Sequence, residues 1–214
     1  MLFKSIDQYC ERIDPTFWSE PINAFSNLAF ILAGLYGFIQ YTKLPVKSSW
    51  PLVFSILCTS IGIGSFLFHT FANGITMIAD VVPILVYIIV FSFYILKELL
   101  VFSWKKILLI NAIFLVASVL SKGTFLNGSI TYIPTLALLL YLTLQFKLKG
   151  SAFKFDLNRL FIVFFINLIF RSSDMAICGV FPIGTHFIWH MGNGLLLFFT
   201  LQLCMKAEAK RVYL

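Results

Sequence analysis

Long, unbroken apolar runs are the feature that most restricts what this sequence can fold into. Each run offers about 17 residues or more, enough for an α-helix to cross a hydrocarbon core roughly 30 Å thick. Turn-forming pairs such as Asn73-Gly74 and Asn127-Gly128 separate the runs. The pattern predicts a single all-α domain over residues 1–214, a polytopic membrane protein with seven transmembrane helices at about 23–41, 50–69, 77–96, 104–120, 130–146, 159–177 and 185–205.

Composition supports the membrane class and argues against two others. Hydrophobic residues make up 60% of the chain and charged residues 12%, whereas a soluble domain is about half apolar and a quarter charged. The runs are too long and continuous for a β-barrel, whose strands alternate apolar and polar residues. The formal charge of +7 comes from Lys and Arg spread over several loops, so we expect no nucleic-acid partner.

Basic residues divide unevenly between the two sides that seven helices would define. Of the 16 Lys and Arg residues, 4 fall in the N-terminal segment and the loops on its side, and 12 fall in the other loops and the C-terminal tail. Because cytoplasmic loops are enriched in Lys and Arg, we expect an acidic N-terminal arm over residues 1–22 outside and the C-terminus in the cytoplasm. A site at the outer helix ends would face the exterior, the periplasm or an organelle lumen.

The three histidines of the chain are the candidate metal ligands. His186 and His190 are four residues apart at the start of the last run, so a helix places them on one face. His69 ends the second run, at the same outer level in this topology. Three imidazoles suit zinc, which histidine binds at about 2.0–2.1 Å, and they leave a fourth position for water. A lone buried histidine is more often a packed core residue, but the spacing and the shared level favour a metal.

Two further polar residues lie near the same level. Asp80, near the start of the third run, is an ionisable residue in a transmembrane segment, which by default marks function. It could be a fourth ligand, a hydrogen-bond partner of an imidazole, or the base that takes a proton from metal-activated water. Ser65 lies one turn before His69 and could donate to a developing oxyanion. Small hydroxyl residues also let membrane helices pack closely, which is the simpler interpretation of Ser65.

Ser65-x-x-x-His69, Asp80 and His186-x-x-x-His190 together resemble the signature of the alkaline ceramidase family. That family belongs to a superfamily of seven-helix hydrolases that includes the progestin and adiponectin receptors. The resemblance covers both ends and most of the chain, through the segments Tyr9-Cys10-Glu11, Trp18-x-Glu20, Ser26-Asn27 and Asp174-x-x-x-Cys178.

The resemblance implies a chemistry. In such enzymes three histidines bind zinc, the aspartate that matches Asp80 activates the bound water, and the serine that matches Ser65 steadies the tetrahedral oxyanion. The reaction is hydrolysis of the amide bond of ceramide to a sphingoid base and a fatty acid. A membrane lipid as substrate also accounts for a hydrolase embedded in a membrane, because both of its chains are lipid-soluble.

The resemblance also implies a second cation. Family members bind calcium through acidic residues of the N-terminal segment, close to the zinc site. Here Asp7, Glu11, Asp14 and Glu20 supply the oxygen ligands that calcium prefers, with Glu11 and Glu20 the best candidates. The spacing departs from the family pattern, because Gln8 stands where an aspartate is expected. The alternative is a solvated acidic arm without calcium.

Cys10 and Cys178 both fall outside in this topology, where disulfides persist. The family pattern agrees with a bridge between them, which would tie the N-terminal arm to the loop before His186. Cys58 and Cys204 fall within helices, where we expect them to act as small apolar residues.

Three other functions stay open. A related hydrolase could cleave a different acyl lipid ester or amide, since cavity shape decides chain length and headgroup. A receptor-like membrane protein could hold zinc for structure alone. A transporter or channel would distribute its charges across the bilayer, whereas Asp80 and the histidines crowd one side. Arg171 and Asp174, three residues apart, are expected to form an ion pair without a chemical role.

Overall fold

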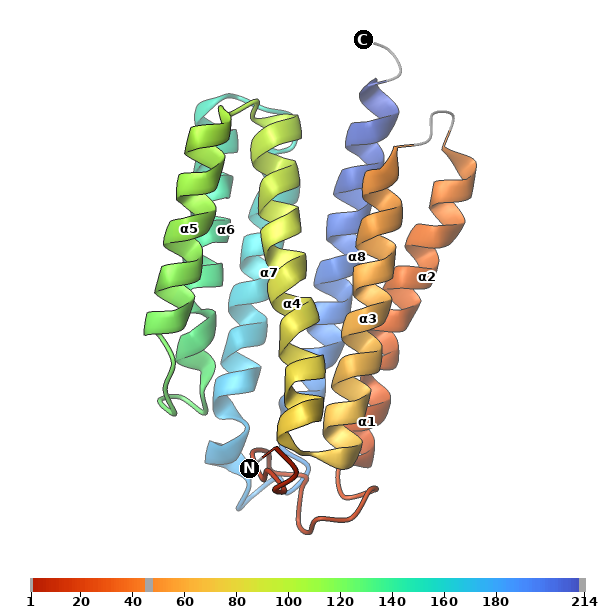
Figure 1. Cartoon of the computed structure of the whole chain (residues 1–214), viewed down its shortest axis with the longest axis vertical. Helices are drawn as coiled ribbons and strands as arrows, with labels where there is room; N and C mark the ends of the chain where they lie inside the picture. The colour runs from red at the N-terminus through yellow and green to blue at the C-terminus, as the bar shows by residue number, and fades with distance from the viewer. Residues whose placement is uncertain (1, 45–47, 212–214) are drawn as a thin grey trace.

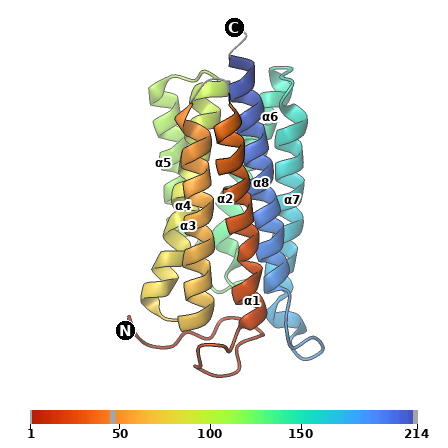
Figure 2. The same cartoon turned by 90° about the vertical axis from the view of Figure 1, so that its right-hand side faces the viewer.

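The computed structural model describes residues 2–44 and 48–211, and every regular element in that part of the chain is helical. The long helices run side by side along the molecule and form one bundle (Figure 1; Figure 2). The predicted all-α class is confirmed. The α-helices are α1 Pro21–Ser26, α2 Leu28–Lys43, α3 Ser49–Phe71, α4 Gly74–Tyr94, α5 Trp104–Leu120, α6 Ile133–Leu148, α7 Lys154–Ser173 and α8 His186–Arg211. Three short turns of other helix types are η1 Ile95–Leu99, η2 Ser129–Tyr132 and η3 Met175–Ile177.

Five helical segments within the described residues are long and apolar enough to cross a membrane. They are Pro21–Lys43, Ser49–Phe71, Gly74–Leu99, Ser129–Leu148 and His186–Lys210. A multi-pass membrane protein is therefore the class that the structure supports. Of the other long helices, α5 has 17 residues, and α7 carries charged residues in its first two turns and Arg171 near its end.

The third and the last predicted helices extend beyond their apolar runs. The side-chain oxygen of Asn73 accepts the N–H groups of Ile75 and Thr76, and the Thr76 hydroxyl accepts the Asn73 N–H in return. This reciprocal cap starts α4 at Gly74 rather than near residue 77. The last helix, α8, continues past residue 205 to Arg211, because the residues that follow the apolar run are alanine, glutamate, lysine and arginine, which are strong helix formers.

A core of fully buried apolar side chains holds the helices together, with Phe54, Tyr94, Leu142, Leu157 and Leu201 among its members. The outward faces of the bundle carry many large exposed apolar residues, for example Ile78 on α4, Leu109 on α5 and Ile166 on α7. Exposed apolar surface on this scale marks a membrane-facing protein rather than a water-facing one.

The N-terminal arm lies across one end of the bundle, and the C-terminal end of α8 lies at the other (Figure 1). The N–H of Ile6 donates to the carbonyl of Ala72 at 2.7 Å, which fastens the arm to the turn between α3 and α4. Ala72 itself closes α3 in a left-handed conformation with φ 42°. The turn is tight, so the last residues of α3 and the first residues of α4 both lie next to the arm.

Candidate metal centre

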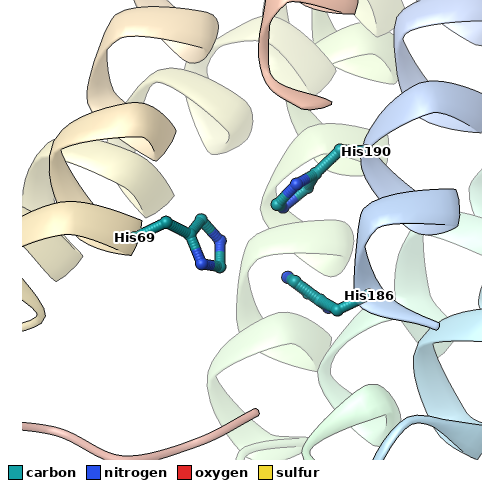
Figure 3. Close-up of side chains that lie close together, drawn as sticks. All are labelled: His69, His186 and His190. Carbon is teal, nitrogen blue, oxygen red and sulfur yellow. The ribbon is translucent and has the colours of Figure 1, made fainter. Parts of the chain in front are cut away.

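Three histidines from two helices converge at the end of the bundle that the arm covers. His69 lies near the end of α3, and His186 and His190 lie in the first turns of α8. Their candidate ligand nitrogens all lie within 4.8 Å of one another, and all three side chains are buried. The His69 ring faces the rings of His186 and His190 across a common space (Figure 3). Within residues 2–44 and 48–211, no other group of three His, Cys, Asp or Glu side chains comes as close.

A buried carboxylate fixes the start of α8. One oxygen of Asp174, Oδ1, accepts the backbone N–H groups of Thr185 at 2.7 Å and His186 at 2.9 Å. The other oxygen accepts the N–H of Cys10 at 3.1 Å. Gly184 precedes the helix with φ 68°, and a Cβ atom there would collide with Asp174 and Cys10. The carboxylate satisfies donors that a helix N-terminus leaves unpaired, so it determines where both α8 histidines point.

His69 is held in place by Glu20. The Nδ1 atom of His69 lies 2.6 Å from Glu20 Oε2, so a proton on Nδ1 is shared with the carboxylate. The other ring nitrogen, Nε2, is buried and has no hydrogen-bond partner among the described residues. A carboxylate on one imidazole nitrogen and an available lone pair on the other is the arrangement of a metal-binding histidine.

His190 and His186 are oriented by different contacts. The Nδ1 atom of His190 lies 2.7 Å from Ser26 Oγ and 3.1 Å from the Asn23 carbonyl oxygen. A proton on that nitrogen satisfies both oxygens and leaves Nε2 as the ligand atom. The ring of His186 instead stacks on Tyr9, with the ring centroids 3.6 Å apart.

The three imidazoles fit a zinc ion. Two nitrogens bound to one zinc ion at about 2.0–2.1 Å each are at most about 4 Å apart. The histidine nitrogens lie within 4.8 Å of one another, so small rotations of the rings bring them onto one ion. The unpartnered His69 Nε2 is a second observation in favour of a metal, because leaving a buried polar atom without a partner is unfavourable.

Asp80 and Ser65 reach the same space from neighbouring helices. Asp80, on α4, forms a side-chain hydrogen bond with Ser65 on α3. One of its oxygens, Oδ1, is buried and has no hydrogen-bond partner among the described residues. With His186 and His190, these two residues line one end of a cavity of about 100 Å³. The structure therefore brings together the five residues that the sequence singled out for zinc chemistry.

The rest of that cavity is apolar and elongated. Helices α4, α6, α7 and α8 supply most of its wall, including Tyr87, Leu138, Leu142, Leu160 and Leu197. Asp80 and Ser92 both line it and are 12 residues apart on α4, which is about 18 Å along the helix axis. A narrow apolar cavity of that length suits an extended hydrocarbon chain.

Arg171 has a different place from the one the sequence indicated. The expected ion pair with Asp174 is not among the ion pairs of the described residues, because Asp174 accepts backbone N–H groups instead. Arg171 is buried beside the cavity, with its Nη1 atom 3.2 Å from the Tyr9 hydroxyl and 3.4 Å from His186 Nδ1. The signal that could have found it is a cation inside a predicted transmembrane helix.

Tyr9 connects the N-terminal arm to the centre. Besides stacking on His186, its ring lies 5.2 Å from the ring of His69. Burial raises the pKa of Tyr9 to about 12, so its hydroxyl keeps its proton at neutral pH. The hydroxyl accepts from Arg171 and lines the cavity, where its own proton is available to a ligand. The sequence pointed to Tyr9 only through the family resemblance.

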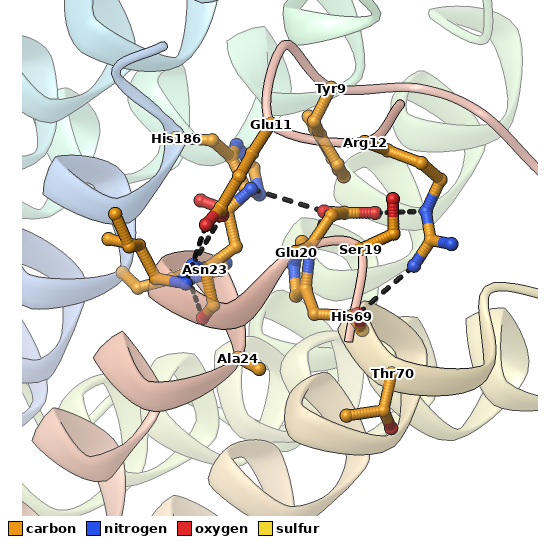
Figure 4. Close-up of polar contacts among 12 residues, drawn as sticks. Tyr9, Glu11, Arg12, Ser19, Glu20, Asn23, Ala24, His69, Thr70 and His186 are labelled. Carbon is orange, nitrogen blue, oxygen red and sulfur yellow. Dashed lines mark hydrogen bonds and ion pairs between the residues drawn. The ribbon is translucent and has the colours of Figure 1, made fainter. Parts of the chain in front are cut away.

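Part of the acidic arm folds over the centre, and Glu20 is its innermost residue. Glu20 is buried and joins two partners, because Oε2 contacts His69 while Oε1 pairs with Arg12 Nε (Figure 4). Burial by itself raises the pKa of Glu20, but the hydrogen bonds and charges of His69 and Arg12 outweigh it and hold that pKa below its ordinary value. Glu20 is therefore an anionic link between the arm and the histidines.

The acidic residues expected to bind calcium are not arranged as a calcium site. Glu11 caps α1 by accepting its first two backbone N–H groups at 2.6 and 2.7 Å. Asp14 accepts a backbone N–H within the arm at 2.8 Å, and Asp7 is exposed. Each oxygen of Glu11 and Glu20 already accepts a hydrogen bond. As arranged here, these carboxylates do not fit a calcium ion, which needs several oxygens directed at one point.

A disulfide joins Cys10 to Cys178 and fastens the arm to the loop that precedes α8. The two cysteines are 168 positions apart in the sequence, so the bridge links two distant segments of the chain that both contribute to the centre. Cys58 and Cys204 are buried thiols within the helices.

The fold and the site together define a class of protein. It is an all-helical, multi-pass membrane protein with a buried three-histidine cluster at the polar end of an apolar cavity. No protein-family model matches the chain, and no curated protein matches it. The resemblance to alkaline ceramidases therefore rests on the residues of the site and enters below as a proposal.

Proposed function

We propose that this protein is a zinc-dependent membrane amidase of the alkaline ceramidase type, which hydrolyses the amide bond of ceramide or a closely related N-acyl lipid. One observation carries the proposal: three buried imidazoles converge beside a carboxylate, at the polar end of an apolar cavity. Both His69 Nε2 and Asp80 Oδ1 are buried without a partner among the described residues. Such atoms are unfavourable in a membrane protein, and a bound metal and its water would satisfy them.

Each residue of the site has a separate role. The three histidines would hold zinc, which when bound would supply a Lewis acid for a carbonyl and for a water molecule. Asp80 is the base that would accept a proton at its oxygen Oδ1 and pass it to the leaving amine. The Ser65 hydroxyl, next to Asp80, donates to the carbonyl oxygen as negative charge develops there. Tyr9, which keeps its proton, is a second donor at the same end of the cavity.

The apolar part of the cavity gives the acyl chain a place to bind. An extended chain would lie along α4 and α8, with its carbonyl group at the histidines and its far end near Ser92 and Thr200. A hydrocarbon chain that moves from lipid into this cavity stays in an apolar environment and gains little free energy from the transfer. Recognition of the substrate therefore depends on the shape of the cavity and on the few polar groups at its histidine end.

We also propose that α5 and α7 cross the membrane, which gives seven spans with the N-terminus outside. Both helices lie side by side with the others over a similar length (Figure 1). The distribution of 4 against 12 basic residues favours this orientation. The Cys10–Cys178 bridge favours it too, because disulfides persist in oxidising compartments. The site would then open toward the exterior, the periplasm or an organelle lumen.

A panel of lipids tests the proposed activity. The purified protein is incubated with N-acyl sphingoid bases and with glycerolipids, with and without a chelator, and released fatty acid is identified by mass spectrometry. We expect fatty acid from the N-acyl sphingoid bases, no release with chelator, and recovery when zinc is added back. Release of fatty acid that is unchanged by the chelator, or no release of fatty acid from any N-acyl lipid, would contradict the proposal.

A hydrolase of a different, acidic acyl lipid is the second candidate, and Arg171 is the observation that favours it. Its guanidinium lines the cavity, and its Nε atom is buried without a partner among the described residues. A carboxylate on the substrate, as in an N-acyl amino acid, would form a charge-assisted hydrogen bond with this group. Faster hydrolysis of acidic N-acyl lipids than of ceramide in the same panel would select this candidate.

A further inference from the structure

Arg12 belongs to the N-terminal arm, yet its side chain is only 2% exposed and contacts the backbone of His69. Its Nε atom pairs with Glu20 Oε1. Its Nη1 donates to the carbonyl of Asp14 at 3.2 Å. Its Nη2 donates to the carbonyl of His69 at 3.1 Å (Figure 4). One guanidinium therefore joins the arm, the buried carboxylate and the end of α3.

The three groups around Arg12 are all oxygen acceptors. One carboxylate and two backbone carbonyls are ligands of the kind that a hard cation such as Ca²⁺ takes. The guanidinium supplies a positive charge at the same point, and its planar set of N–H donors suits a carboxylate. A buried carboxylate needs such a cation, because an uncompensated charge in this environment is strongly destabilising.

Apart from Glu20 Oε1, which pairs with Arg12, the nearby oxygens of Glu11 and Glu20 have other partners. Both oxygens of Glu11 accept backbone N–H groups of α1, and neither is paired with Arg12 among the described residues. The second oxygen of Glu20 contacts His69 and also accepts from Asn23 Nδ2 at 3.1 Å. Arg12 is therefore the cation that compensates Glu20.

We propose that Arg12 is a built-in cation that takes the place of a second metal ion, so that the arm and His69 are held without calcium. Through Glu20, Arg12 keeps a carboxylate aligned on His69 Nδ1, and this directs Nε2 toward the metal position. Arg12 is thus a positioning residue for a metal ligand. The link to zinc rests on the proposed function, whereas the independence from calcium does not.

Calcium independence is tested on the wild-type protein in detergent. The Tm is measured with excess CaCl2 and with EGTA, and Ca²⁺ is titrated into the protein by calorimetry. We expect the same Tm in both conditions and no saturable heat of binding. A saturable calcium site that raises the Tm and disappears in Glu20→Gln would overturn the proposal.

The positioning role is tested with two substitutions that separate charge from packing. Arg12→Gln removes the charge and keeps N–H donors, Arg12→Lys keeps the charge, and Lys4→Gln, in the exposed part of the same arm, is the control. Zinc affinity is measured by competition with a chromogenic chelator, which needs no turnover. We expect roughly a ten- to hundred-fold weaker affinity in Arg12→Gln, a smaller loss in Arg12→Lys, and no change in Lys4→Gln.

The other outcomes decide against the proposal. Equal losses of zinc affinity in Arg12→Gln and Arg12→Lys would show that Arg12 contributes packing and not charge. Unchanged zinc affinity in both variants would show that Arg12 does not position His69. If Arg12→Gln does not fold, the calcium titration of the wild-type protein still decides the central point. A protein that gives the expected zinc and calcium results but releases no fatty acid would contradict the amidase proposal alone.

Discussion

Asp80 is the residue whose surroundings are hardest to explain without chemistry. A carboxylate inside a membrane-spanning helix is unfavourable, and one oxygen of Asp80 is buried without a partner among the described residues. A residue kept for helix packing would leave that oxygen uncompensated. A base, in contrast, needs an oxygen that is available to accept a proton, and the oxygen lies in the cavity next to Ser65 and the histidines.

Replacing Asp80 by asparagine should separate metal binding from turnover. Asp80→Asn keeps the size of the side chain and removes the base, so we expect normal zinc content and a hydrolysis rate roughly 10²- to 10⁴-fold lower. Zinc is measured by mass spectrometry of the purified protein, and turnover by release of fatty acid. The control is Asp156→Asn. Asp156 lies in the first turn of α7 and pairs with Lys206, at the end of the bundle away from the histidines, so the substitution should change neither quantity. Wild-type turnover in Asp80→Asn would leave Asp80 with a structural role.

At the level of residues, the spacing of the chain predicted the candidate ligands but not what supports them. His186 and His190 follow from the helical period alone. The contact between Glu20 and His69 joins residues 49 positions apart, and the inward turn of Arg12 depends on the path of an irregular segment. No local pattern encodes either contact, because both arise only when the arm has folded against the bundle.

The helices α3 and α4 approach closely at Gly64, one residue before Ser65. A Cβ atom at Gly64 would collide with the backbone carbonyl of Ala79, which directly precedes Asp80. Small residues at membrane helix interfaces allow such close contact. The approach brings Ser65 and Asp80 near each other, so the packing of two helices sets the geometry of the proposed catalytic pair.

A methyl group at this contact should disturb both stability and activity. In Gly64→Ala the obstacle is backbone, which cannot rotate away, so we expect a cost of about 1–3 kcal/mol and a lower Tm. We also expect slower hydrolysis with zinc still bound, because Asp80 moves while the histidines stay. In the control Gly123→Ala, the new atom meets only Ile130, at 3.7 Å. An unchanged Tm and unchanged turnover in Gly64→Ala would show that this contact does not set the geometry.

At the level of elements, apolar runs located the long helices well, and their ends less well. The early start of α4 comes from the Asn73 cap, which is a side-chain pattern that hydrophobicity does not measure. The short helix α1, Pro21–Ser26, begins where a predicted arm of residues 1–22 ends. Proline favours a first helical position, but the carboxylate that caps α1 comes from Glu11, across the folded arm.

The whole molecule has two different ends. One end carries the arm, the disulfide and the histidines, and the other carries the C-terminal end of α8 (Figure 1). The apolar cavity connects the histidine end to the middle of the bundle. Its existence and length could not be predicted from sequence, because its wall combines side chains of several helices whose relative rotation the apolar runs leave open.

Cysteine labelling tests the proposed orientation. Thr124→Cys lies between α5 and α6, and Lys147→Cys lies at the other end of α6. We expect a membrane-impermeant maleimide to label Thr124→Cys in intact cells and Lys147→Cys only after the membrane is opened. The native cysteines give little background, since one pair is bridged and the other two are buried. The reverse pattern would show that the protein has the opposite orientation in the membrane. Identical labelling of both positions would show that α6 does not span the membrane.

The metal content of the purified protein is the most direct test of whether His69, His186 and His190 share one ion. Zinc per chain is measured by inductively coupled plasma mass spectrometry for the wild type and for His190→Ala, with helical content checked by circular dichroism. The shared site predicts about one zinc ion per chain in the wild type and none in a folded His190→Ala protein. Full zinc content in His190→Ala, or a wild-type protein that takes up no zinc when it is supplied, would contradict it.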